Sequence, residues 1–178
     1  MSGGVGYAQR HLEHSDYYDE HRRVQGEWNG RGAEFLGLRG EVKQEHFEAI
    51  REGLNPETGE FLRPRHSADR IGVDGSEQSK GRSLYDLTFS APKSVSVQAL
   101  VGGDERLVAA HDKAVSETLL EVESQAAARV RLSGANENRV TANMIIASYR
   151  HDTSRELDPQ LHTHAVAANL THDSAEGC

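Results

Sequence analysis

The sequence has little of three things: cysteine, long apolar stretches and excess positive charge. Its one cysteine, Cys178, excludes an intrachain disulfide and a cysteine-rich zinc site, and it fits a reducing cytoplasm. No stretch reads as a secretory signal or a membrane span. The formal net charge of −8 argues against a general nucleic-acid binder, because phosphate neutralisation usually leaves a basic surface. Any contact with nucleic acid is therefore expected to be local.

At 178 residues, with 36% hydrophobic content, the chain is long enough for one globular domain with its own core. Hydrophobic periodicity predicts helices over 41–53 and 104–130, and strands over 84–89, 140–150 and 161–170. Residues 7–23 suggest one or two short helices, followed by a loop over 26–40. These elements predict an α+β fold, an antiparallel sheet with helices on one side and with Asp86 and three histidines on the opposite face.

Three histidines form the most informative pattern. His162 and His164 are two residues apart on a predicted strand, so their rings leave the same face, and His151 is expected to join them from the preceding strand. Three neutral imidazoles leave open positions on a metal ion for a substrate oxygen, as catalysis requires. The alternative is a polar hairpin with ordinary histidines. Asp152 and Asp158 are candidates either for orienting the rings or for capping turns.

A tyrosine pair, Tyr17-Tyr18, is the second candidate group. A phenol has a pKa near 10, so a nucleophilic tyrosine needs a nearby base or a cation that stabilises the phenolate. Asp86 is a candidate for that base. Taken alone, adjacent tyrosines more often serve packing or lie on the surface.

Three blocks of sequence resemble one family over nearly the whole chain. The blocks are Tyr17-Tyr18 with 26–34 (GEWNGRGAE) and 36–38 (LGL), 86–96 (DLTFSAPKSVS), and 150–155 (RHDTSR) with 158–166 (DPQLHTHAV). The sequence is similar to the N-terminal part of MobF-class conjugative relaxases of the TrwC/TraI type. The second and third blocks are long and highly specific, and the first is weaker.

The resemblance implies an HUH endonuclease fold, with an antiparallel sheet backed by helices. It also implies site- and strand-specific cleavage of DNA at a plasmid transfer origin, in which a tyrosine becomes joined to the 5′ phosphate. Carried over by motif, the metal ligands are His151, His162 and His164. Asp86 becomes the carboxylate that orients a ligand or assists the tyrosine. Two basic residues of the specific blocks, Lys93 and Arg155, are expected to contact DNA.

The sequence departs from the family pattern at its tyrosines and in its length. Family members usually carry two tyrosine pairs, and by its distance to Trp28 the pair here matches the second. The expected nucleophile is therefore Tyr18 or Tyr17, ahead of Tyr7. Relaxase domains of the family also continue beyond this length, so residues 1–178 are expected to be a single relaxase domain truncated on its C-terminal side.

The expected cofactor is a divalent metal ion, with Mg²⁺, Mn²⁺ and Zn²⁺ all left open. The expected partners are single-stranded transfer-origin DNA and relaxosome or type IV secretion coupling proteins, in the cytoplasm and without a membrane span. Two other functions remain open at this point. One is a remnant that binds origin DNA without cutting it, and the other is a hydrolytic three-histidine metalloenzyme that acts on small esters.

Overall fold

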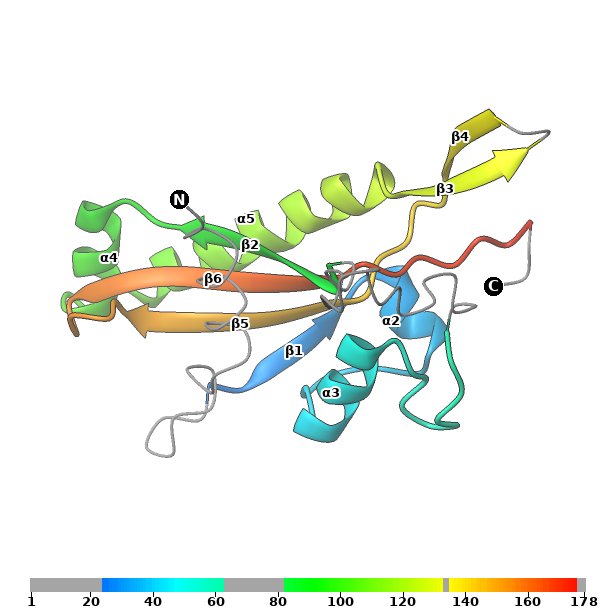
Figure 1. The fold of residues 1–178 in the computed structure, drawn as a ribbon. Coiled ribbons are helices and arrows are strands. Elements are labelled where there is room, and N and C mark those ends of the chain that lie inside the picture. Colours follow the sequence, from blue (N-terminus) through cyan, green and yellow to red (C-terminus); the bar gives the residue numbers. More distant parts are fainter. Residues whose placement is uncertain (1–23, 63–81, 133–134, 176–178) are drawn as a thin grey trace, which may run out of the picture.

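A four-stranded antiparallel sheet forms the centre of the molecule (Figure 1). The computed structural model describes residues 24–62, 82–132 and 135–175, so the candidate nucleophiles Tyr7, Tyr17 and Tyr18 lie outside the described residues. The strands, in their order across the sheet, are β1 (Gly26–Asn29), β5 (Ile146–Thr153), β6 (Pro159–Ala168) and β2 (Leu84–Ser90). β5 and β6 are therefore the central pair, joined by a short turn.

Helices cover both faces of this sheet (Figure 1). On one face lie the two N-terminal helices, α2 (Arg31–Phe35) and α3 (Gln44–Glu52), and on the other lie α4 (Lys93–Leu100) and α5 (Glu105–Ser124). Two separate apolar clusters reflect this arrangement, one around Trp28 and Tyr149 and the other around Leu119 and Ile146. Consecutive residues of a strand point to opposite faces, which is why neighbours such as Ile146 and Ala147 fall in different clusters.

Local sequence explains where two of the helices begin or end. Asp104 is the N-cap of α5, and its carboxylate accepts a hydrogen bond from the Arg106 backbone N–H at 3.2 Å. Gly53 ends α3 in the left-handed conformation, with a φ of 77°, which glycine adopts without steric cost. Among the described helices, none combines the length and the hydropathy that crossing a bilayer would require.

The α+β class and the antiparallel sheet predicted from the sequence are confirmed. The prediction that helices lie on only one side of the sheet was wrong. The long helix also ends earlier than its periodicity predicts: 127–130 belong to β3 (Ala127–Leu132), which forms a projecting hairpin with β4 (Ala135–Val140) (Figure 1). The Ala126 carbonyl accepts the Thr141 backbone N–H at 2.8 Å, so tertiary pairing replaces helical bonding there.

Two further expectations are corrected. The strand expected over 140–150 is split, because Ala142 has a φ of 50° and interrupts the extended chain between β4 and β5. The expected loop over 26–40 contains β1, which pairs with β5, followed by α2. In both places the pairing of backbone across the sheet decides the conformation, and local composition does not reveal it.

Glu123 is a buried carboxylate that joins three segments of the fold. It is 4% exposed, and its Oε1 accepts the backbone N–H groups of Arg31 at 2.7 Å and Met144 at 2.8 Å. The chain passes so close that a side chain at Gly30, where φ is 93°, would meet the Met144 carbonyl. Glu123 therefore fastens the end of α5 to the start of α2 and to the segment before β5.

Replacing Glu123 by Ala is expected to lower the free energy of unfolding by about 3 kcal/mol, because two buried N–H groups lose their acceptor. Glu123→Gln keeps one acceptor oxygen and is expected to cost about half as much. Urea denaturation followed by circular dichroism measures both. The exposed neighbour on the same helix, Glu121, supplies the control, because Glu121→Ala is expected to change stability by less than about 0.5 kcal/mol. Equal effects at the two positions would contradict the role given to Glu123.

Candidate metal centre

The β5–β6 pairing brings the three predicted histidines together. His151 lies directly opposite His162, and His164 follows two residues later on the same face of β6. Their ring centroids are 5.1 Å apart for His151 and His162, 5.2 Å for His162 and His164, and 5.5 Å for His151 and His164. The rings lie on the face of the sheet opposite α5, near the turn that joins the two strands. One short hairpin therefore positions all three imidazoles.

Asp86 orients the ring of His164. It lies on β2, and its Oδ2 and Oδ1 are 2.9 and 3.0 Å from His164 Nδ1. Thr88, the residue that pairs with His164 across the β2–β6 ladder, places its hydroxyl 3.3 Å from the same nitrogen. Because a carboxylate only accepts hydrogen bonds, Nδ1 carries the proton and Nε2 carries the lone pair. This is the arrangement in which a carboxylate prepares a histidine for metal binding.

The ring of His162 is oriented in the same way by the backbone. Its Nδ1 is 3.0 Å from the Gln160 carbonyl oxygen, which can only accept, so Nδ1–H donates and Nε2 holds the lone pair. Two of the three rings thus share one tautomer for the same physical reason. Asp86 and the Gln160 carbonyl take the orienting role that the sequence had suggested for Asp152 and Asp158.

His151 is held neutral. Burial, followed by the neighbouring imidazoles of His162 and His164, lowers the pKa of His151 to about 4. Its ring therefore has no proton to release at pH 7 before it binds a cation. An uncharged ring also removes electrostatic repulsion between the closely spaced histidines.

The donor set fits a divalent transition metal after small side-chain rotations. In the described part of the chain, no group of three His, Cys, Asp or Glu side chains is already set to hold an ion. His151 is stacked on His162 with an interplanar angle of 23°, so their nitrogens do not yet converge. Metal–nitrogen bonds of about 2.1 Å require the rings to turn about their side-chain torsions. The strands, the tautomers and the neutral charge of His151 already meet the requirements of such a site.

Helix α5 supports the hairpin from behind. His111 Nε2 lies 2.9 Å from the Thr163 hydroxyl, and Arg150 forms an ion pair of 2.6 Å with Asp112. Arg150 and Thr163 face each other across the β5–β6 ladder and alternate with the candidate ligands. Burial lowers the pKa of His111, so it acts there as a neutral hydrogen-bonding group. Two consecutive helix residues therefore brace the strands that bear the histidines.

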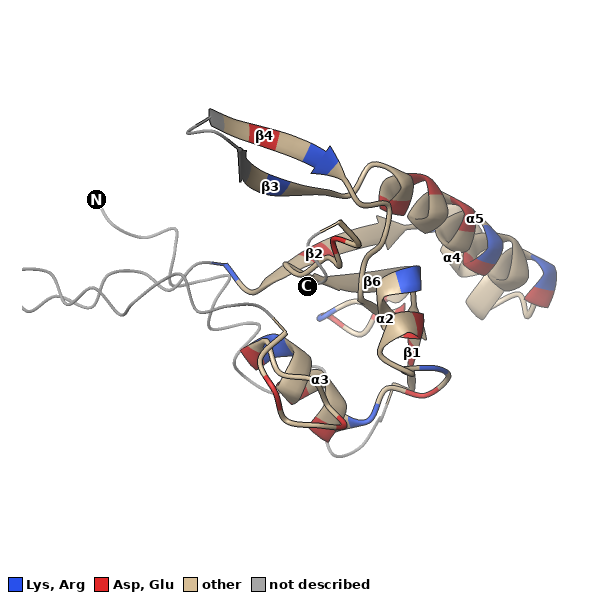
Figure 2. Ribbon diagram, turned by 90° about the vertical axis from the view of Figure 1, so that its right-hand side faces the viewer, with Lys and Arg blue, Asp and Glu red and all other residues tan. Residues whose placement is uncertain are grey.

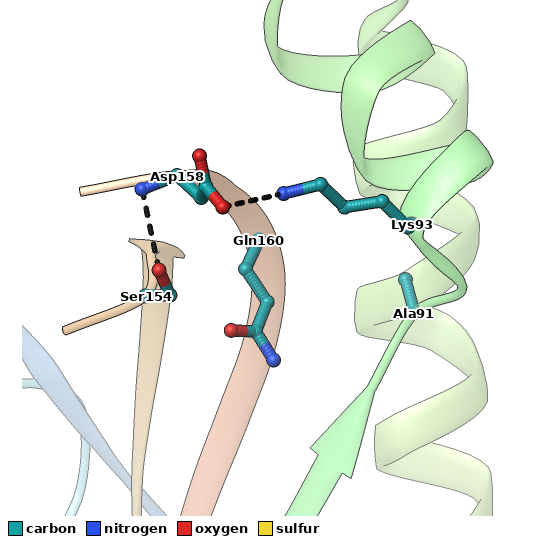
Figure 3. A pocket seen from close by; sticks show the side chains of 5 residues that line it. All are labelled: Ala91, Lys93, Ser154, Asp158 and Gln160. Atoms are coloured by element: carbon teal, nitrogen blue, oxygen red, sulfur yellow. Dashed lines mark hydrogen bonds and ion pairs between the residues drawn. The ribbon is translucent and has the colours of Figure 1, made fainter. Parts of the chain in front are cut away.

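A shallow hollow lies beside the tip of the hairpin (Figure 3). The residues that line it are Ala91, Lys93, Ser154, Asp158 and Gln160, and its volume is about 250 Å³. Lys93 Nζ lies 3.4 Å from Asp158 Oδ2 and donates to the Pro159 carbonyl at 3.2 Å. Asp158 thus pairs with a lysine at the mouth of the hollow and does not orient a histidine.

The two basic residues of α5, Arg106 and Lys113, lie in its first half and its second half carries only acidic residues, so the helix has no continuous basic stripe (Figure 2). Two cations of the described residues lie at the hairpin tip: Lys93, at the start of α4, and the exposed Arg155, in the turn after β5. The contacts of Thr88 and His111 were not predicted from the sequence. Thr88 could have been found, because it shares a strand face with Asp86, whereas nothing in the sequence pairs His111 with Thr163.

Comparisons with known proteins agree with this geometry. The sequence profile of the TrwC relaxase family matches residues 1–178. The multifunctional conjugation protein TraI of Escherichia coli (strain K12) is 46% identical over 149 residues, which make up 84% of this chain and 8% of TraI. This chain is therefore similar to a small part of that protein.

Two solved structures of the conjugative relaxase TrwC in complex with oriT DNA have the same fold. The metal-free complex has a TM-score of 0.77 at 43% identity and covers 96% of this chain and 55% of the TrwC chain. The metal-bound complex has a TM-score of 0.76 at 44% identity and covers 91% and 53%. The chain thus spans about half the length of these relaxases. From the profile match over its full length and from these identities, the chain belongs to the TrwC relaxase family.

Proposed function

We propose that this chain performs the DNA-nicking step of a conjugative relaxase, the site- and strand-specific cleavage of single-stranded DNA at a plasmid transfer origin. The observation that carries the proposal is the group of three facing imidazoles on β5 and β6, one of which is oriented by Asp86. A divalent cation bound by His151, His162 and His164 would polarise the scissile phosphate and stabilise the charge that develops there.

The proposed reaction is a transesterification. A tyrosine oxygen forms a bond to the phosphorus, the bond from phosphorus to the 3′ oxygen breaks, and the 3′ oxygen takes up a proton. The phenolic proton leaves to a base or to solvent. The product is a 5′-phosphotyrosine with a free 3′ hydroxyl, and a later hydroxyl reverses the step to reseal a strand. We assign the nucleophile to Tyr18 or Tyr17.

Asp86 is better suited to orienting His164 than to activating the tyrosine. Both of its oxygens lie within hydrogen-bonding distance of His164 Nδ1, which favours a fixed carboxylate that holds one ring. His162 receives the equivalent support from the Gln160 carbonyl. In both rings the Nδ1 contact leaves Nε2 as the nitrogen available to the cation.

We further propose that Lys93 and Arg155 contact the phosphates of the bound strand. Both lie at the hairpin end that carries His151 and His162, and Lys93 is 59% exposed. Its ammonium is already paired with Asp158, so the carboxylate competes with a DNA phosphate for the same cation. Local positive charge of this kind suits an acidic protein that binds DNA at one place.

Opposite changes are expected from the two members of this pair. Lys93→Ala should weaken binding of a labelled single-stranded origin oligonucleotide and reduce the slope of log affinity against log salt by about 0.7. Asp158→Asn should strengthen binding, because it releases the lysine. Fluorescence anisotropy over a salt series measures both. Lys113, which is 76% exposed and pairs with Glu117 on α5, is the matched control, and Lys113→Ala should leave the slope unchanged. If Lys93→Ala and Asp158→Asn change DNA binding in the same direction, the proposed competition between Asp158 and phosphate is contradicted.

The proposed function is tested by incubating the chain with single-stranded transfer-origin DNA and Mn²⁺ or Mg²⁺. A covalent protein–DNA band on a denaturing gel, absent after chelation with EDTA, is the expected result. Salt-sensitive binding without any covalent band would identify the alternative, an origin-binding remnant that does not cleave. Relaxosome or type IV secretion coupling proteins are the partners we propose for the reaction, in the cytoplasm.

A further inference from the structure

The end of β2 leaves a break in the β2–β6 ladder next to the candidate metal centre. Ala91, just after β2, donates its backbone N–H to the Leu161 carbonyl at 2.9 Å. In a regular antiparallel pair the return bond would run from the Leu161 N–H to the Ala91 carbonyl. That bond is not formed here, because the chain turns away at Pro92 to begin α4. Leu161 is 0% exposed, so its N–H needs another acceptor.

Ser96 fills this break with its side chain. Its Oγ accepts the Leu161 N–H at 3.1 Å and lies 3.2 Å from the Pro92 carbonyl and 3.5 Å from the Ala91 carbonyl. Ser96 is itself 0% exposed, so water does not compete for these contacts. One hydroxyl thus bridges a donor on β6 and an acceptor at the start of α4, where two strands would otherwise bond directly.

We propose that Ser96 is a positioning residue for the metal centre, which fixes the β6 backbone at Leu161 and thereby the direction of His162. The inference rests on the proposed function. Leu161 lies between the Gln160 carbonyl, which orients the His162 ring, and His162 itself. The same helix also holds Pro159, two residues before Leu161, because Lys93 Nζ donates to the Pro159 carbonyl at 3.2 Å. α4 therefore fixes the backbone on the approach to the ligand at two points.

If Ser96 bonded only to a carbonyl of its own helix, its replacement would not affect β6. Serine and threonine often bond the carbonyl four residues earlier within their own helix, and loss of that bond has only a local effect. Thr118 on α5 makes this bond alone, to the Ala114 carbonyl at 2.7 Å, on an exposed surface. Thr118 therefore provides a control for the hydrogen bond of Ser96 to the Pro92 carbonyl, four residues earlier. What distinguishes Ser96 is the second contact, across to β6.

The test compares Ser96→Ala, Ser96→Cys and Thr118→Ala with the unchanged chain. Ser96→Cys leaves no cavity, because its side chain is slightly larger, but it offers only a weak acceptor, so it separates lost packing from the lost hydrogen bond. Three quantities are measured: binding of Co²⁺, followed by calorimetry and by its visible spectrum; hydrogen exchange of the Leu161 amide without metal; and the NMR signal of the His162 Nδ1 proton. Urea denaturation confirms that each variant is folded.

Both Ser96 variants are expected to bind Co²⁺ about tenfold more weakly, with an altered visible spectrum, as for loss of other groups that support metal ligands. The Leu161 amide should exchange about tenfold faster, and the His162 Nδ1 proton signal should shift or broaden. Thr118→Ala should match the unchanged chain in all three. If Ser96→Ala or Ser96→Cys binds Co²⁺ like the unchanged chain, the positioning role is overturned and the proposed function stands. If the unchanged chain binds no Co²⁺, the metal centre itself fails and the positioning role is overturned with it.

Discussion

Replacing His164 by Ala is expected to abolish metal binding at the β5–β6 hairpin and, with it, the covalent DNA product. Because one of the three proposed ligands is lost, the affinity for Mn²⁺ or Co²⁺ should fall by more than the 10–100-fold typical of losing a supporting group. Asp86→Asn tests the contribution of the supporting carboxylate. It removes the negative charge beside His164 Nδ1 and should weaken metal binding by about tenfold. Isothermal titration calorimetry measures both losses.

The matched control for the ligand is a histidine outside the group. His46 lies on α3, and His46→Ala is expected to bind metal like the unchanged chain. Because His164 is partly exposed, its loss should leave the metal-free fold intact, as circular dichroism would show. Undiminished affinity in His164→Ala would mean that the three facing rings do not form the metal site. Loss of metal binding with the DNA product retained would instead separate the metal from the cleavage chemistry.

Replacing Tyr17 and Tyr18 together by Phe is expected to remove the covalent protein–DNA band completely while DNA binding stays within about twofold of the unchanged chain. Phenylalanine keeps the ring but has no oxygen to attack phosphorus, so the effect is on the bond-forming step alone. A phenol with its usual pKa near 10 is a weak nucleophile at neutral pH, and a nearby divalent cation would stabilise its ionised form.

The single variants then assign the nucleophile. The tyrosine whose replacement by Phe removes the covalent band, Tyr18 or Tyr17, carries the reacting oxygen. Tyr7→Phe is expected to keep the band. Tyr85, an exposed tyrosine on β2, is the control for general effects of the substitution, because Tyr85→Phe should form the band normally. A covalent band that persists in the double variant would place the nucleophile outside this pair.

Much of the sheet could be predicted from the sequence because its strands alternate. β2 and β6 follow the expected alternation of side chains, and this alone placed His162 and His164 on one face together with Asp86. The start of α5 was likewise predicted from the helix expected over 104–130, because an acidic residue before an amphipathic run is a local feature. Where structure depends on neighbours in sequence, the pattern was sufficient.

The elements that could not be predicted depend on contacts between distant residues. β3 follows α5 without a break in apolar spacing, and its partner, β4, has a mostly polar sequence, so only their pairing makes them strands. The site shows the same limit. The three histidines were visible in the sequence, but the contact of Ser96 with Leu161 spans 65 residues and follows no periodicity.

Strand β6 serves two purposes with alternate residues. Leu161, Thr163 and Ala165 are buried towards α4 and α5, while His162 and His164 lie between them on the other side. Inserting or deleting one residue in this strand would exchange the two sets, bringing imidazoles under α4 and α5 and apolar side chains to the face that now carries the histidines. Natural variation in β6 should therefore consist of replacements at constant length, with changes of length confined to the turn that precedes it.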